Sequence, residues 1–161
     1  MTIKILDCTL RDGGYYCNWD YSDDLISRYL IVMQQLQVDY VEIGFFSRSA
    51  PNKYRGRSFY TRQAFLDKLD IPESIPIGVM INASEILAAS ADGGLDEFLG
   101  ELPRNIQFVR VACHSHELGG LDDALEFFKS RQLQVGINLM QIKGASQCTL
   151  AQFVKVCKKN K

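Results

Sequence analysis

An arginine, an aspartate and two glycines lie together near the start of the chain, directly after a short apolar segment. The stretch reads Leu6-Asp7-Cys8-Thr9-Leu10-Arg11-Asp12-Gly13-Gly14. It places a cation and a hard oxygen ligand side by side, and its two glycines free the backbone from the ordinary φ limits. Because the preceding residues read as a strand, Arg11 and Asp12 come at a strand's carboxyl end, where α/β barrels hold their chemistry. The structural alternative is a solvated surface ion pair.

Glu42 is the second candidate, because it interrupts the apolar strand predicted over 40–45. Parallel strands of a barrel are normally buried on both faces, so a carboxylate there needs a partner. With a period of two, Glu42, Gly44 and Phe46 share one side of the strand. If that side faces the barrel interior, Glu42 could reach Arg11. The alternative is that Glu42 faces a covering helix and is paired there.

Arg110 is a cation inside another apolar strand and needs a partner for the same reason. A buried pair of Arg110 with Glu42 or with Asp7 would be structural, and we expect that role for Arg110.

Both histidines of the chain follow the predicted fourth strand, as His114 and His116. Residues at i and i+2 of a strand project the same way, so the two rings form a possible metal clip that Asp12 could complete. The alternative is that both are ordinary polar residues at a loop entrance.

A long polar loop follows the second strand, over 47–57, and contains four cations. It could clamp an anionic substrate, with Arg48 as a substrate-binding residue, although charged loops are more often only solvated. Tyr15 and Tyr16 follow the two glycines. Their hydroxyls could donate protons at a site, Tyr16 being a second substrate-binding candidate, or their rings could cover the top of the barrel.

Strand-like and helix-like segments alternate along the whole chain. Predicted strands span 3–7, 40–45, 76–81, 106–112 and 134–142, and helical segments lie between them, one of them capped by Ser22 and another broken at Gly93 and Gly94. An amphipathic helix is expected over 59–69. Units of about 30 residues match the spacing of a (β/α)8 barrel, whose usual size is about 250 residues.

We therefore predict an α/β fold in which residues 1–161 form the first five parallel βα units, a partial (β/α)8 barrel that is the N-terminal part of one catalytic domain. The alternative is a complete five-stranded doubly wound sheet, although the chain has no glycine-rich dinucleotide fingerprint.

Composition limits the class of partner. With 47% hydrophobic and 23% charged residues the chain is typical of a globular domain, and its formal net charge of -1 with scattered cations gives no footprint for nucleic acid or anionic lipid. No secretory pattern or membrane-spanning run is present, so the cytoplasm is expected. The five cysteines include no Cys-x-x-Cys pair and are expected to be reduced, with Cys17 or Cys113 the alternatives for a catalytic thiol. A half-barrel with open edges predicts a homo-oligomer.

Three segments together resemble a known superfamily: the opening stretch, Val41-Glu42-Ile43-Gly44-Phe45, and Val109-Arg110-Val111-Ala112-Cys113-His114. They are similar to the metal-dependent aldolases and lyases that include 3-hydroxy-3-methylglutaryl-CoA lyase, isopropylmalate synthase and, most similar, 4-hydroxy-2-oxovalerate aldolase. The resemblance implies cleavage or formation of a carbon–carbon bond in a small-molecule 2-oxo acid with a divalent Mg or Mn ion. It also implies that Asp12 binds the ion, that Arg11 stabilises the enolate, and that Glu42 steadies Arg11.

The chain departs from the family's pattern at two places. Pyruvate-forming aldolases carry a histidine base where this chain has Tyr15, so Tyr15 and His114 are the acid/base candidates. The family's other metal ligands, a His-x-His pair on the seventh strand, lie beyond Lys161, so this chain alone should bind the ion weakly and catalyse little. The alternatives are an acyl-CoA condensing enzyme or CoA-ester lyase of the same superfamily, and a non-catalytic half-barrel binding module.

Overall fold

The computed structural model describes residues 3–48 and 53–159, and its centre is a five-stranded parallel sheet. The strands are β1 (Leu6–Asp7), β2 (Tyr40–Phe45), β3 (Ile77–Asn82), β4 (Ile106–Cys113) and β5 (Gln134–Leu139). Their spatial order is β1-β2-β3-β4-β5, and each pairing between neighbours is parallel. A doubly wound sheet reverses its strand order, so that alternative is wrong. The sheet instead curls into a half-barrel, as expected for a partial (β/α)8 fold.

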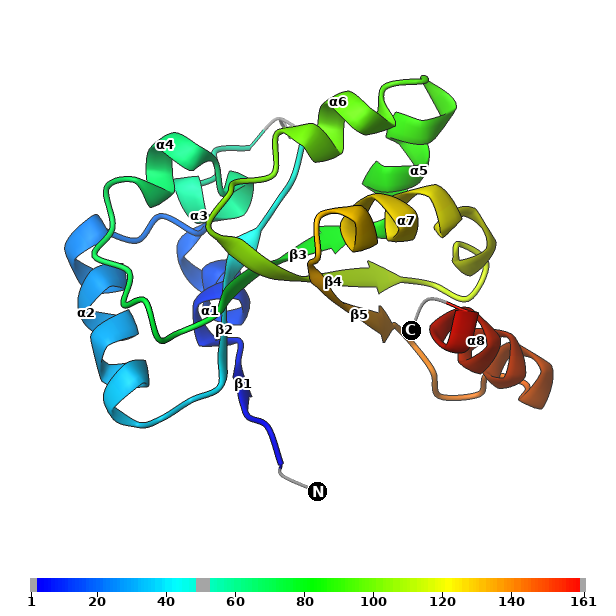
Figure 1. The fold of residues 1–161 in the computed structure, drawn as a ribbon, viewed down its shortest axis with the longest axis horizontal. Coiled ribbons are helices and arrows are strands. Elements are labelled where there is room, and N and C mark those ends of the chain that lie inside the picture. Colours follow the sequence, from blue (N-terminus) through cyan, green and yellow to red (C-terminus); the bar gives the residue numbers. More distant parts are fainter. Residues whose placement is uncertain (1–2, 49–52, 160–161) are drawn as a thin grey trace.

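Helical segments follow each strand (Figure 1). They are α1 (Thr9–Cys17), α2 (Asp23–Gln35), α3 (Arg57–Tyr60), α4 (Gln63–Leu66), α5 (Ala83–Ala91), α6 (Leu95–Gly100), the 3-10 turn η1 (Leu118–Gly120), α7 (Asp122–Ser130) and α8 (Gln147–Lys159). Figure 1 shows α2, α4, α6 and α7 following one another in an arc around the sheet. Within the described ranges, none of these helices has the length and apolarity that crossing a bilayer would require.

The cap and the buried face of α2 are as the sequence predicts. The Ser22 hydroxyl accepts a hydrogen bond from the Leu25 amide at 3.2 Å, which satisfies one of the free N–H groups of the first turn. Ile26 and Leu30, one turn apart, are fully buried against the sheet. The packing of this apolar stripe therefore holds α2 to the convex side.

β1 and the helix expected over 59–69 differ most from the sequence prediction. β1 contains only two residues, and the side chains of Ile3 and Ile5 before it are 87% and 57% exposed. The helix expected over 59–69 is divided into α3 and α4, because Thr61 adopts a left-handed backbone with φ 37°. The break predicted at the glycine pair between α5 and α6 is confirmed, with Gly93 at φ 70°.

Gly13 and Gly14 were expected to allow backbone angles outside the ordinary φ range. Both instead lie inside helix α1. Their role is close packing. A Cβ on Gly14 would lie 2.1 Å from the Trp19 indole, and one on Gly13 would lie 2.8 Å from the Tyr21 hydroxyl. Tertiary contact therefore explains two residues of low helix propensity at these positions.

A register shift in β2 changes which residues face the barrel interior. The shift falls between Glu42 and Gly44, so that Phe45 rather than Phe46 lies on the same side as Glu42. Phe46 packs in the outer core beneath the helices. The predicted sharing of one side by Glu42, Gly44 and Phe46 is thus wrong. Gly44 is needed there because a Cβ would lie 1.9 Å from the Ser58 carbonyl oxygen.

Candidate active site

A fully buried carboxylate with two arginine partners lies at the centre of the concave face. Glu42 of β2 has no exposed surface. Its Oε1 accepts a hydrogen bond from Arg11 Nε at 2.6 Å, and its Oε2 accepts one from Arg110 Nη1 at 3.2 Å. Glu42 therefore faces the barrel interior, and the alternative of a partner on a covering helix is wrong. Because a carboxylate accepts several hydrogen bonds, it fixes both guanidinium groups.

The buried side chains of this cluster carry an excess of positive charge. Two guanidinium groups oppose one buried carboxylate, and Asp12, which also pairs with Arg11, is 61% exposed at the rim. Burial opposes the charge of Arg11, but the hydrogen bond to Glu42 and the nearby carboxylates outweigh it, so the pKa of Arg11 is raised. Arg11 is therefore a permanent cation at the carboxyl end of β1.

Arg110 extends from β4 across the concave face towards β1. Its Nη1 also contacts Cys8 Sγ at 3.1 Å, and its Cγ would lie 3.3 Å from a Cβ on Gly136. Burial and the negative charge of Glu42 raise the pKa of the Cys8 thiol, although both arginines oppose the shift. Asp7 lies elsewhere and accepts a hydrogen bond from the Tyr29 hydroxyl at 2.7 Å. The suggested Arg110–Asp7 pair is therefore wrong, and the Arg110–Glu42 pair is confirmed.

Aromatic rings cover the carboxyl end of the sheet beside Arg11. Its guanidinium carbon lies 5.7 Å from the centre of the Phe45 ring, which Tyr15 contacts edge-on at 6.4 Å. Tyr15 is 65% exposed and packs 4.8 Å from Trp19. Tyr16 is 95% exposed, so it does not line this cluster. The structure thus brings Arg11, Asp12, Glu42 and Tyr15 to one mouth.

Trp19 belongs to the same cluster, and reasoning from sequence did not identify it. Its indole Nε1–H donates a hydrogen bond to the Arg11 carbonyl oxygen at 2.9 Å, and its side chain is only 2% exposed. The available signal was the one tryptophan of the chain, five residues after Gly14.

The histidines follow β4, which is three strands along the sheet from β1. The His114 amide donates to Glu117 Oε2 at 2.7 Å, and the two imidazole rings stack with centroids 5.6 Å apart. Among the described residues no group of three His, Cys, Asp or Glu side chains is arranged to hold a metal ion. The expected combination of Asp12 with His114 and His116 is therefore not formed. Asp12 is a single carboxylate at the rim of the mouth, and the described residues place no second and third ligand beside it.

Arg48 and Arg57, two described residues of the polar loop over 47–57, contact neighbouring helices. The Arg48 amide donates to Glu85 Oε2 at 2.7 Å, and its guanidinium lies over the Phe98 ring of α6 at 5.5 Å. Arg57 pairs with Asp23 of α2 at 2.5 Å. Residues 49–52 of this loop lie outside the described residues. Arg48 is thus directed to α6 and away from Arg11.

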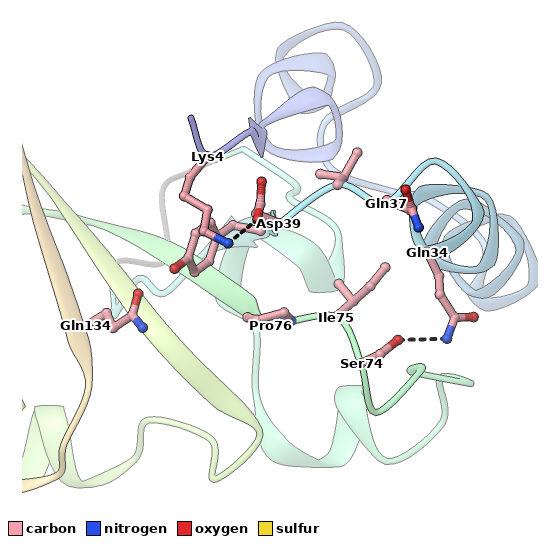
Figure 2. Close-up of a pocket in the computed structure, with 10 residues that line it drawn as sticks. Lys4, Gln34, Gln37, Asp39, Ser74, Ile75, Pro76 and Gln134 are labelled. Atoms are coloured by element: carbon pink, nitrogen blue, oxygen red, sulfur yellow. Dashed lines mark hydrogen bonds and ion pairs between the residues drawn. The ribbon is translucent and has the colours of Figure 1, made fainter. Parts of the chain in front are cut away.

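Two of the pockets among the described residues lie at the amino ends of the strands and on the concave face. One, of about 470 Å³, is formed at the amino ends of the strands, where Figure 2 shows the Lys4–Asp39 ion pair at 2.6 Å and the Gln34–Ser74 hydrogen bond at 2.7 Å. The other, of about 320 Å³, lies on the concave face and includes Arg110 among its lining residues. In barrels the amino ends of the strands contribute stability and the carboxyl ends carry catalysis, so we place the candidate site at the Arg11 mouth.

The fold and this mouth define an open parallel α/β half-barrel with a buried arginine–carboxylate cluster. Among solved structures, the chain is similar to the N-terminal domain of a putative aldolase from Bacteroides vulgatus, with 28% sequence identity and a TM-score of 0.78. The similarity covers 98% of this chain and 51% of that one, so the chain spans about half the length of the protein it matches. No protein-family profile and no curated protein matches it.

Proposed function

We propose that this half-barrel supplies the arginine-bearing part of an aldolase or lyase site that acts on a 2-oxo acid. The single observation that carries the proposal is the Arg11 guanidinium, held at the carboxyl mouth by the buried Glu42 through a 2.6 Å hydrogen bond. The structural similarity to an aldolase domain supports the same class of reaction.

Carbon–carbon cleavage in a 4-hydroxy-2-oxo acid needs a base and a stabiliser of negative charge. The base removes the 4-hydroxyl proton, a carbonyl forms at C4, the C3–C4 bond breaks, and its electron pair becomes the enolate of the product oxo acid. Arg11 is a preorganised cation for that enolate oxygen, because Glu42 already fixes its direction. Tyr15, at the same mouth, is our candidate for the proton transfer, and His114 is the second candidate.

The first test is binding of oxalate, a planar dianion that resembles the enolate of pyruvate. Calorimetry should show binding to the chain, and Arg11→Lys should weaken it about tenfold or more because Lys loses the planar fork. Arg104→Lys is the matched control, since Arg104 is an exposed cation whose ion pair with Asp67 spans 3.6 Å. Equal oxalate affinity in the Arg11→Lys and Arg104→Lys variants would contradict the proposal.

Turnover distinguishes an enzyme from a binding module. Pyruvate released from 4-hydroxy-2-oxopentanoate can be followed through NADH oxidation by lactate dehydrogenase. Oxalate binding without pyruvate release would favour the non-catalytic half-barrel. Binding of acetyl-CoA in place of oxalate would favour the acyl-CoA enzymes of the resembling superfamily.

A further inference from the structure

Two consecutive residues after helix α1 have a left-handed backbone. Asn18 has φ 55° and Trp19 has φ 56°. Asparagine tolerates this region, but a bulky residue such as tryptophan is an outlier there and keeps the conformation only where its surroundings impose it. The conformation of Trp19 therefore requires a physical account.

The loop that precedes α3 holds this conformation in place. The Gly56 amide donates to the Asn18 carbonyl oxygen at 2.7 Å, and Arg55 Nη1 donates to Asn18 Oδ1 at 2.9 Å. The Arg55 guanidinium also lies over the Trp19 ring at 5.1 Å and over the Phe59 ring at 5.5 Å. A Cβ on Gly56 would lie 2.1 Å from the Trp19 carbonyl oxygen, so only glycine allows this approach.

In this arrangement the Arg55 guanidinium leaves one of its N–H donors without a hydrogen-bond acceptor in the described part of the chain. Its Nε is buried and has no hydrogen-bond partner among the described residues. Buried polar atoms are rarely left unpaired, so the stacking of the guanidinium on Trp19 must offset the loss. Arg55 therefore makes a cation–π contact with the Trp19 indole and is not simply a solvated cation of the loop.

The clamped indole in turn holds the backbone of Arg11. Trp19 Nε1–H donates to the Arg11 carbonyl oxygen at 2.9 Å, while the Arg11 guanidinium is bound to Glu42 at 2.6 Å. The indole also packs closely against Gly14, where a Cβ would lie 2.1 Å from the ring, so it lies directly on α1. Arg11 is therefore fixed from both ends, by its side chain and by its carbonyl group.

We propose that Trp19, clamped in a left-handed conformation by Arg55 and Gly56, is a positioning residue that fixes Arg11 at the mouth of the half-barrel. The importance of this role for catalysis rests on the proposed function. The positioning itself does not, because it can be measured in the free protein.

The test compares Trp19→Phe with Tyr21→Phe. The first removes the indole donor to the Arg11 carbonyl but keeps an aromatic ring. The second removes an equivalent donor to the neighbouring carbonyl of Leu10, which Tyr21 contacts at 3.1 Å. Nitrogen-15 NMR follows hydrogen exchange of the Arg11 Nε–H, assigned by its absence in Arg11→Lys. Exchange should become about fivefold faster in Trp19→Phe, the factor expected for one lost hydrogen bond, and stay within about twofold in Tyr21→Phe.

A second pair of variants retains Trp19, so the proposal can still be tested if Trp19→Phe does not fold. Arg55→Met removes the cation–π contact with Trp19, and Arg57→Met removes another cation of the same loop that lies on Phe65. Arg55→Met should shift the Trp19 emission to longer wavelength and speed exchange of the Arg11 Nε–H, whereas Arg57→Met should change neither. Unchanged exchange in Trp19→Phe, or in Arg55→Met if the former does not fold, would overturn the proposal. Faster exchange in a chain whose wild type does not bind oxalate would support positioning and refute the proposed function.

Discussion

Replacing Glu42 with glutamine should destabilise the protein more than any exposed charge substitution. The side chain has no exposed surface, and its two partners are themselves largely buried, with Arg11 12% and Arg110 21% exposed. Glutamine keeps the volume but removes the charge, which leaves two guanidinium groups facing each other in the concave face. Removing one partner of a buried ion pair costs about 3–5 kcal/mol.

Urea unfolding measures this cost directly. With a slope of about 2 kcal/mol per molar urea, a loss of about 3–5 kcal/mol lowers the midpoint by about 1.5–2.5 M without changing the slope. Glu101→Gln is the matched control, because Glu101 is 53% exposed and lies 3.6 Å from Arg62. An exposed pair of this kind contributes about 0–1 kcal/mol.

The double variant Glu42→Gln with Arg110→Met tests the assigned cause. Removing the Arg110 guanidinium, which pairs with Glu42 whereas Arg11 keeps its pair with Asp12, should recover about 1–2 kcal/mol relative to the sum of the single variants. If Glu42→Gln lowers the midpoint no more than Glu101→Gln, the view of Glu42 as the counter-charge of both arginines is refuted.

Three further predictions concern the framework. Gly44→Ala should cost about 2–3 kcal/mol in urea unfolding, because its Cβ would lie 1.9 Å from a carbonyl oxygen of α3, whereas Gly100→Ala, which meets no atom within 4 Å, should be neutral or slightly stabilising. Burial raises the pKa of the Cys113 thiol to about 11, so the folded state holds this proton more tightly than the unfolded state, and stability should fall as pH rises from about 9 to about 11. At pH 8 a thiol reagent should modify the exposed Cys148 and not Cys113; rapid modification of Cys113 would contradict its burial. Ser22→Ala should lower stability by about 1 kcal/mol, and an unchanged urea midpoint would refute the capping role.

Apolar periodicity was sufficient to predict five strands and their parallel arrangement, although β1 and β5 are shorter than the predicted spans 3–7 and 134–142. β2 and the capped start of α2 are found where the pattern places them, because each depends on burial of local residues such as Ile26 and on the Ser22 cap. The sequential strand order follows from the repeated βα unit, since each helix returns the chain beside the strand just formed.

What the sequence could not predict depends on contacts between distant residues. The glycine pair after β1 does not resemble a helix until Trp19 is known to pack against Gly14. The change of side at Gly44 depends on the approach of α3 to β2, which no period of two contains. Pairing of Glu42 with Arg11 could be anticipated from the buried charge, whereas the Trp19–Arg11 hydrogen bond could not.

The strand order also has a consequence for how the chain folds during synthesis. Because every strand pairs with the strand made just before it, a growing chain can add βα units one at a time from its N-terminus. The Arg11–Glu42 pair, 31 residues apart, is complete once β2 has been made. Arg110 lies 68 residues beyond Glu42 and 102 beyond Cys8, so its contacts form only when the fourth strand docks. Glu42 therefore gains its second arginine partner only after β4 has been made and has paired with β3.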